Sequence, residues 1–182
     1  STGRHMLELI NGILDLSKLE SGVVEMDESA FELDEFLSDI ARMMAVKGGE
    51  TGASITVENK AGIGRKLIAD HLMIRQVLIN LVGNAIKFSP GGNVKLIAEI
   101  GDERLRLIIE DNGVGIPPED LPSITEMFKQ ARTNDPEQHG GSGIGLTIAK
   151  RLAGLHDCEF ELDSTLGEGT RVTLTFPKER LG

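Results

Sequence analysis

The sequence has a single cysteine, Cys158, among 182 residues, so no disulfide can form within the chain. A lone cysteine suits a reducing compartment. No apolar run approaches the roughly 18–20 residues that cross a bilayer, and we find no internal repeat or low-complexity segment. Basic residues number 19 against 29 acidic ones, for a net charge of -10, and they form no cluster. This balance argues against nucleic acid or an anionic membrane surface as a partner.

Three common nucleotide-binding signatures are also missing. The chain has no G-x-x-x-x-G-K-[ST] segment, which excludes a Walker P-loop, and no H-R-D or D-F-G triplet, which excludes the protein-kinase set. The segment Gly141-Ser142-Gly143-Ile144-Gly145-Leu146 is not a Rossmann fingerprint, because it follows a polar loop and lacks the third glycine.

Two glycine-rich turns, which bracket a polar segment, are the most informative part of the sequence. The first is Asp111-Asn112-Gly113-Val114-Gly115-Ile116-Pro117, and the second, residues 140–146, leads into a helical pattern. Glycine permits close backbone approach, and a helix N-terminus offers unpaired N–H groups to phosphate. Tight turns explain most single glycine clusters. Together the two turns favour a nucleotide site in which Asp111 reads a base and the second turn holds phosphates.

Hydrophobic periodicity predicts helices over residues 4–20, 33–46, 71–88 and 145–155. It predicts strands over residues 54–58, 66–69, 93–100, 104–110, 158–162 and 171–176, with 23–26 a short strand or linker. Hairpin-linked strands with helices available to cover one face predict an α/β two-layer sandwich with a mixed sheet, preceded by a helical arm. The wide apolar stripe of the 4–20 helix packs either on its own domain or in a helical hairpin or dimer bundle.

The helix predicted over residues 71–88, with Asp70 as its N-cap, has two distinct faces. Its buried face is expected to comprise Ile74, Val77, Leu78, Leu81, Val82 and Ala85. Gln76, Asn80, Asn84 and Lys87 follow at spacings of four, four and three, which places them on the opposite face. This row is either an ordinary solvated face or a set of oxygen ligands with one cation, which suits a metal-bound polyphosphate.

Several segments in a fixed order resemble the motifs of bacterial sensor histidine kinases. Residues 80–88 resemble the N box, 111–116 the G1 box, 127–130 the F box, 141–146 the G2 box and 167–170 the final glycine box. Residues 17–22 resemble the end of the dimerisation and phosphotransfer domain. The resemblance covers essentially the whole chain. It implies an ATP-binding catalytic domain with the Bergerat fold, which Hsp90, gyrase B and MutL share, over residues 23–182, with a lid at about 117–140. Residues 1–22 are then a stub of the preceding domain, and the chain a piece of a longer protein.

The resemblance also implies roles for individual residues. Asn84 is expected to ligate Mg²⁺ with help from Asn80, and Lys87 to contact phosphate. Asp111 is expected to accept a hydrogen bond from the exocyclic amine of adenine, which favours ATP over GTP. The other residues implied in nucleotide binding are Phe88, Gly113, Gly115, Ile116, Phe128, Arg132, Gly141, Ser142, Gly143, Ile144, Gly145, Leu146 and Thr170.

Asn80 bears on the chemistry, since the ATPases of this superfamily have a glutamate there as general base. An amide cannot accept a proton, so water activation is disfavoured and phosphoryl transfer is favoured. The resemblance implies transfer from ATP to a histidine of an upstream phosphoacceptor domain, then to a response-regulator receiver domain, in a homodimeric full-length protein. It implies a bacterial cytoplasmic domain, whose parent can be anchored in the inner membrane. An ATPase, or a module that binds nucleotide or a partner without chemistry, remains an alternative.

The chain departs from the family pattern in two places. None of its histidines, His5, His71, His139 and His156, stands in the context of the family's acceptor histidine. The chain is therefore expected to bind Mg-ATP without phosphorylating itself. The segment His156-Asp157-Cys158 replaces the His-Gly-Gly of many relatives, and we expect this to alter only local packing.

Overall fold

The computed structural model describes residues 25–116, 119 and 144–182. Several predictions lie outside the described residues: the 4–20 helix, most of the lid, and the candidates Phe128, Arg132, Gly141, Ser142 and Gly143.

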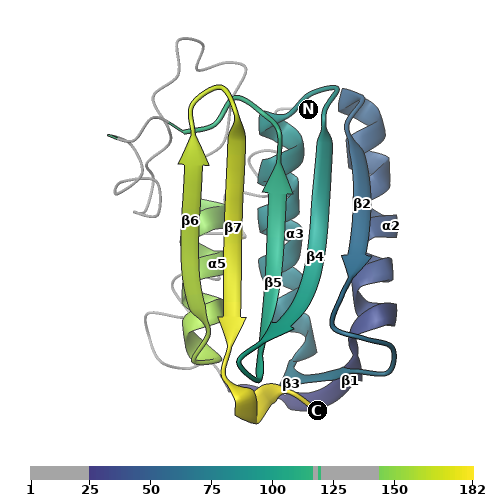
Figure 1. Ribbon diagram of the computed structural model, residues 1–182, viewed down its shortest axis with the longest axis vertical. Helices are drawn as coiled ribbons and strands as arrows, with labels where there is room; N and C mark the ends of the chain where they lie inside the picture. Colours follow the sequence, from purple (N-terminus) through teal and green to yellow (C-terminus); the bar gives the residue numbers. More distant parts are fainter. Residues whose placement is uncertain (1–24, 117–118, 120–143) are drawn as a thin grey trace.

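Five strands form one mixed sheet in the order β2-β4-β5-β7-β6 (Figure 1). The strands are β2 (Ser54–Asn59), β4 (Asn93–Gly101), β5 (Arg104–Asp111), β6 (Glu159–Thr165) and β7 (Gly169–Phe176). β2 and β4 run parallel, whereas the other neighbouring pairs are antiparallel. The two predicted hairpins, β4–β5 and β6–β7, meet through β5 and β7, so the sheet joins segments far apart in the sequence.

The helices α2 (Leu33–Thr51), α3 (His71–Phe88) and α5 (Ile144–Leu155) all cover one face of this sheet (Figure 1). The hydrophobic core lies between the two layers, and its fully buried side chains include Leu78 of α3, Leu96, Leu107, Leu174 and Phe176. The predicted two-layer sandwich with a mixed sheet is therefore confirmed. None of the helices among the described residues is both long and apolar enough to span a bilayer.

Helix α3 has the bounds that the sequence predicts, and the side chain of Asp70 caps it by accepting a hydrogen bond from the Met73 backbone N–H at 3.1 Å. Helix α2 is longer than predicted. It continues through Gly48 to Thr51 and ends at Gly52, whose φ is +76°. Gly48 is buried, and a Cβ there would lie 2.7 Å from the Ala53 carbonyl oxygen. The predicted end at residue 46 was wrong, because tertiary packing outweighs the low helix propensity of the glycines that follow it, Gly48 and Gly49.

A second, two-stranded sheet, which the sequence did not predict, pairs β1 (Glu28–Glu32) with β3 (Lys66–Asp70). Residues 25 and 26 belong to the segment 23–26, expected to be a short strand or a linker, and they are not in a strand. The chain end closes this small sheet, since the 3₁₀ turn η1 (Lys178–Arg180) leads to a bridge between Leu181 and Leu67. Both elements lie at the end of the main sheet opposite to the end of β5 (Figure 1).

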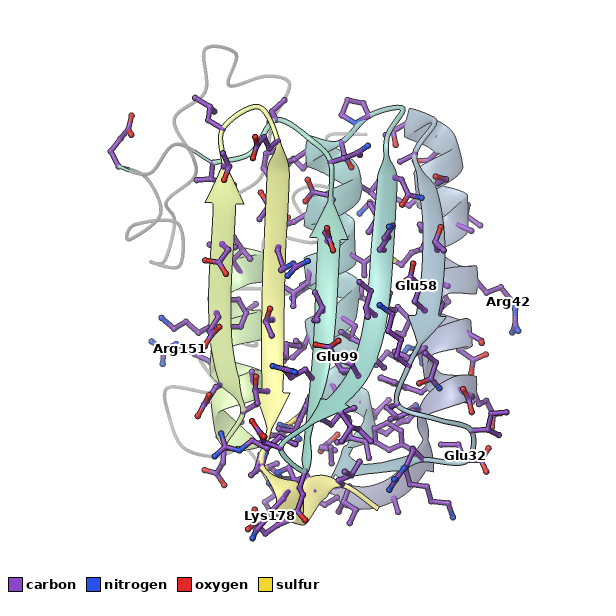
Figure 2. The ribbon with its side chains drawn as sticks, in the orientation of Figure 1. Glu32, Arg42, Glu58, Glu99, Arg151 and Lys178 are labelled. Atoms are coloured by element: carbon purple, nitrogen blue, oxygen red, sulfur yellow. The ribbon has the colours of Figure 1, made fainter. Side chains whose placement is uncertain are left out.

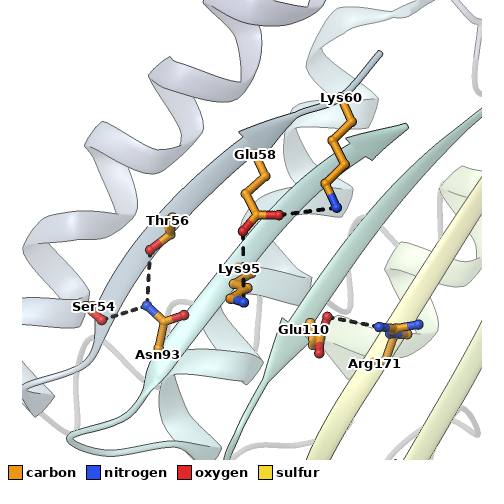
Figure 3. Close-up of polar contacts among 8 residues, drawn as sticks. All are labelled: Ser54, Thr56, Glu58, Lys60, Asn93, Lys95, Glu110 and Arg171. Atoms are coloured by element: carbon orange, nitrogen blue, oxygen red, sulfur yellow. Dashed lines mark hydrogen bonds and ion pairs between the residues drawn. The ribbon is translucent and has the colours of Figure 1, made fainter. Parts of the chain in front are cut away.

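The face of the main sheet without helices carries polar side chains that pair across strands. Glu58 and Glu99 lie on this face (Figure 2). Glu58 contacts Lys60 and Lys95 at 3.6 and 3.9 Å, and Arg171 donates to Glu110 at 3.1 Å (Figure 3). Exposed ion pairs contribute little to stability. This face is thus polar, several of its charged side chains pair with one another, and the predicted site residues lie elsewhere.

Candidate functional site

The predicted site residues that the structure describes gather at one end of the sandwich. Three chain segments meet there: the C-terminus of α3 at Phe88, the end of β5 at Asp111, and the start of β7 at Thr170 (Figure 1). Helix α5 ends at Leu155, next to His156, which bonds to Asp70 at the N-terminus of α3. The start of α5 at Ile144 therefore lies at the same end of the sandwich as Phe88. The structure therefore brings the ends of the N-box, G1 and final glycine segments together.

The polar row on α3 lies where its spacing predicts. The residues expected to face the core are buried, whereas Gln76 is exposed and Asn80, Asn84 and Lys87 are half-buried. The Gln76 side-chain amide donates to Asn80 Oδ1 at 3.0 Å, and Lys87 Nζ lies 5.7 Å from the centroid of the Phe88 ring. The predicted division of α3 into an apolar and a polar face is confirmed.

Asp111 is buried, with 8% of its surface exposed. Its Oδ1 accepts a hydrogen bond from the Gly113 N–H at 2.9 Å. The backbone N–H groups of Gly113 and Thr170 both act to lower the pKa of the carboxyl. Even so, burial raises the pKa of this carboxyl, and the nearby Glu110 adds to the effect. The protein's own donors thus compensate only part of the cost of removing a carboxylate from water. A further donor from a ligand would therefore be favourable at this position.

Two glycines of the turn after Asp111 fit against the protein's own backbone. A Cβ at Gly113 would lie 2.1 Å from the Phe88 carbonyl oxygen, and one at Gly115 would lie 2.2 Å from the Thr165 carbonyl oxygen. The Val114 N–H donates to the Phe88 carbonyl at 3.2 Å. The resemblance implied that both glycines take part in nucleotide binding. In the structure they let the turn after β5 contact α3 on one side and the β6–β7 hairpin on the other.

Ser164 joins the site, although the sequence did not single it out. Its Oγ accepts a hydrogen bond from the Ile116 N–H at 2.6 Å and lies 2.9 Å from Thr170 Oγ1. The hairpin register could have revealed it, since Ser164 stands directly opposite Thr170. The sequence analysis did not identify Ser164 because it lies outside every glycine-rich motif.

Four other candidates can be placed in part. The side chains of Ile116 and Leu146 are buried in the hydrophobic core. Ile144 and Gly145 open α5.

The departure at residues 156–158 lies at the opposite end of α3 from Asp111. His156 is fully buried, and its Nε2 accepts a hydrogen bond from the Asp70 N–H at 3.0 Å. Its Nδ1, 2.8 Å from the Leu152 carbonyl oxygen, must therefore carry the proton of the neutral ring and donate it. Arg180 donates to the His156 carbonyl at 2.7 Å and forms an ion pair with Glu28 at 2.8 Å. Asp157 has φ +55°, a left-handed conformation that explains why a glycine can serve at this position.

His156 makes the stability of the fold dependent on pH. Burial lowers its pKa, as does the positive charge of Arg180, while the Leu152 carbonyl, Asp70 and Glu28 oppose this. A protonated Nε2 cannot accept the Asp70 N–H. The unfolded chain therefore binds a proton near pH 6.5 that the folded chain does not bind until a lower pH. This contribution to stability is complete above pH 6.5 and is lost as the pH falls below it, with a limiting slope of about 1.4 kcal/mol per pH unit.

Thermal unfolding between pH 7.5 and 5.5 checks this expectation on the wild type and His156→Gln, whose side chain cannot titrate. The wild-type Tm should fall more steeply on acidification than that of the variant. Parallel profiles would show that another group controls the stability in this range.

Three comparisons place this geometry among known proteins. The family model for histidine kinase-, DNA gyrase B- and HSP90-like ATPases matches residues 69–180. The histidine protein kinase DivJ of Caulobacter vibrioides is 35% identical over 178 residues, which cover 97% of this chain and 29% of DivJ.

Two solved structures are similar as well. The crystal structure of full-length ShkA in complex with AMPPNP has a TM-score of 0.84 and 29% identity, and the match covers 97% of this chain and 36% of ShkA. The nucleotide-free catalytic domain of the histidine kinase ThkA has a TM-score of 0.71 and 25% identity, over 84% of this chain and 97% of that domain. The chain spans only 21% to 34% of the length of three other curated relatives.

Proposed function

The chain belongs to the family of histidine kinase-, DNA gyrase B- and HSP90-like ATPases and has the fold of the ATP-binding catalytic domain of histidine kinases, and from this premise we propose that it delivers the γ-phosphoryl group of ATP to a histidine. The resemblance read from the sequence motifs is thereby confirmed at the level of family and fold.

Asp111 is the observation that carries the proposal at the level of residues. Asp111 is a buried carboxylate at the end of a central strand, and the donors around it offset only part of the cost of its burial. Such a group fits a ligand that donates a hydrogen bond. The exocyclic amine of adenine is such a donor, whereas guanine has a keto oxygen at the corresponding position. Phe88 and Thr170 flank this point from α3 and β7 and are proposed to contact the nucleotide with it.

The polar row on α3 is proposed to hold the phosphate end. The amide oxygens of Asn84 and Asn80 are hard ligands of the kind that Mg²⁺ takes, and they are half-buried on one helix face. When bound, Mg²⁺ offsets the negative charge of the phosphates. Lys87, one turn beyond Asn84, would contribute a cation from the same face. The backbone at the start of α5, at Ile144 and Gly145, is proposed to present N–H groups to phosphate.

The kind of chemistry follows from Asn80, which occupies the position of the general-base glutamate in the ATPases. A carboxamide does not accept a proton from water at neutral pH, so the site lacks a base at that place. Phosphoryl transfer to a nucleophile that is already positioned needs orientation and charge stabilisation more than proton abstraction. We therefore favour transfer to a histidine over steady hydrolysis.

We place the acceptor and the later partners in a longer parent protein, because the curated relatives are much longer than this chain. We propose that an upstream helical domain supplies the acceptor histidine, that a receiver domain takes the phosphoryl group onward, and that the full-length protein is a homodimer. The names of relatives such as LuxQ, a sensor kinase/phosphatase, and DivJ, a histidine protein kinase, support the kinase part of this proposal.

A transfer assay tests the proposal. The chain is incubated with Mg²⁺ and γ-labelled ATP, alone and with the separately produced helical domain that precedes it in its parent protein. We expect label on the helical domain that is acid-labile and stable to base, as for phosphohistidine, and none on the chain alone. Release of free phosphate without labelling of the acceptor would favour an ATPase. Acid-labile label on the chain alone, lost in His5→Ala, would show that the acceptor is in this chain.

A further inference from the structure

Three polar side chains form a row across β5, β7 and β6 at the end of the sheet where the candidate site lies. Asp111 stands opposite Thr170, and Thr170 stands opposite Ser164. Directly opposed residues of antiparallel strands project to the same face, so a carboxylate and two hydroxyls are aligned. We propose that Ser164 is a positioning residue of the nucleotide site, which orients the Thr170 hydroxyl and anchors the backbone at Ile116 beside Asp111. This inference rests on the proposed function.

The hydrogen bonds of Ser164 define how it acts. Its hydroxyl has one proton and two lone pairs. The proton goes to the Gly169 carbonyl oxygen at 3.0 Å, and one lone pair accepts the Ile116 N–H at 2.6 Å. Thr170 Oγ1, at 2.9 Å, must then donate its own proton to the remaining lone pair. Every hydrogen-bonding position of Ser164 is occupied, and the Thr170 hydroxyl is held with its oxygen as an acceptor for other groups.

The same contacts connect Ser164 to the base-reading carboxylate. Thr170 stands directly opposite Asp111, and its backbone N–H favours the charged form of the carboxyl. Gly169 fits so closely that a Cβ would lie 2.0 Å from the Asp111 carbonyl oxygen. On the other side, Ile116 follows Gly115, which contacts the Thr165 carbonyl. Ser164 thus fixes β7 and the turn after β5 to one another, with Asp111 between them.

Without the hydroxyl, the Ile116 N–H and the Gly169 carbonyl lose a partner, and the Thr170 side chain is free to turn. Ser164→Ala should therefore weaken ATP binding about tenfold, which is in the range expected for disrupted, partly buried hydrogen bonds. The factor should be the same for ADP as for ATP, because the row adjoins the base end and not the γ-phosphate. Ser164→Thr retains the hydroxyl and should bind ATP nearly as the wild type does.

Calorimetric titrations with ATP and ADP test these expectations, with Thr165→Ala as the matched control. Thr165 is the next residue on β6 and is exposed on the opposite face, so its loss should leave the affinity unchanged. The pH profile of ATP binding provides a readout that simple loss of stability does not shift. In Ser164→Ala the fall in affinity on acidification should begin at higher pH. The Thr170 backbone N–H, which favours the charged form of Asp111, is then held less firmly beside the carboxyl.

Two further measurements keep the proposal testable independently of nucleotide binding. Amide hydrogen exchange at Ile116 in the nucleotide-free protein should accelerate in Ser164→Ala and not in Thr165→Ala. A double-mutant cycle with Thr170→Val should show that the two losses are not additive. Wild-type affinity and wild-type exchange at Ile116 in Ser164→Ala, or an equal loss of affinity in Thr165→Ala, would overturn the role of Ser164. A wild-type chain that binds no adenine nucleotide would instead overturn the proposed function.

Discussion

Asn84→Ala is expected to weaken Mg-dependent ATP binding on the order of 100-fold, or roughly 2.7 kcal/mol, while the fold is retained. Asn84 is half-buried on the polar face of α3, and its amide oxygen is the principal ligand proposed for Mg²⁺. The buried face of α3 does not include Asn84, and alanine has a higher helix propensity than asparagine. The loss should therefore appear in binding and not in the Tm.

Titrations with and without Mg²⁺ make the test specific to the metal. The wild type should bind ATP more tightly when Mg²⁺ is present, and Asn84→Ala should lose most of that gain. A matched control is Asn59→Ala, which removes the same kind of side chain at the last residue of β2, away from the candidate site. Asn59 donates to Asp34 there and accepts from the Ala61 N–H. This control should lower the Tm and leave ATP affinity unchanged. A full response to Mg²⁺ in Asn84→Ala would refute the assignment of Asn84 as a ligand.

The parts of the fold that could be predicted are those with a strong local pattern. Helix α3 shows this, since its 3.6-residue periodicity and the cap at Asp70 define both its ends and its buried face. The hairpins β4–β5 and β6–β7 were similarly visible as alternating runs around short turns. These patterns also located the polar row of Asn80, Asn84 and Lys87 and the carboxylate at the end of β5.

The missed elements depend on contacts between distant segments. Strand β1 carries the sequence ESAFE, in which only Phe31 is partly buried, so it has little hydrophobic pattern and is a strand because β3 pairs with it. Helix α2 continues through Gly48, where the Ala53 carbonyl oxygen lies so close that a Cβ would be only 2.7 Å from it. Sequence alone shows the low helix propensity of this glycine but not the tertiary neighbour that leaves no room for a side chain.

The same limit applies to the site. The motifs identified glycines at residues 113, 115 and 169 but not what lies against them, which is the backbone of Phe88, Thr165 and Asp111 respectively. The interlocking of α3, the turn after β5 and the β6–β7 hairpin is a property of the assembled fold. Ser164 was missed for this reason, although its register partner Thr170 belongs to a recognised motif. The roles assigned to individual residues at this end of the sheet stay predictions, and the most direct of them concerns Asp111.

Asp111→Asn is expected to weaken ATP binding by roughly 1–3 kcal/mol, the cost of a mispaired buried polar group. The substituted amide keeps the shape of the carboxylate and one acceptor oxygen, which can still bond to the Gly113 N–H. It also introduces an NH₂ group, which would meet the amine of adenine as a second donor. The variant should bind ATP and GTP with similar affinities, whereas the wild type should prefer ATP. Equal affinities in the wild type would refute Asp111 as the base reader.

The electrostatics of Asp111 separate this loss from a loss of folding. Because burial raises the pKa of the carboxyl in the folded chain, its ionised form disfavours folding above that pKa, and a neutral asparagine should leave the Tm unchanged or higher. Acidification protonates the wild-type carboxyl at a higher pH than an ordinary aspartate, so ATP affinity should fall on the acid side, and this limb should be absent in Asp111→Asn. Glu110→Gln is the matched control, since it removes the same charge from the adjacent residue on the helix-free face, where Glu110 pairs only with the exposed Arg171 among the described residues. It should retain the preference for ATP and an acid limb, with the limb at somewhat lower pH because Glu110 no longer raises the pKa of Asp111. An acid limb that persists in Asp111→Asn would assign the titration to another group.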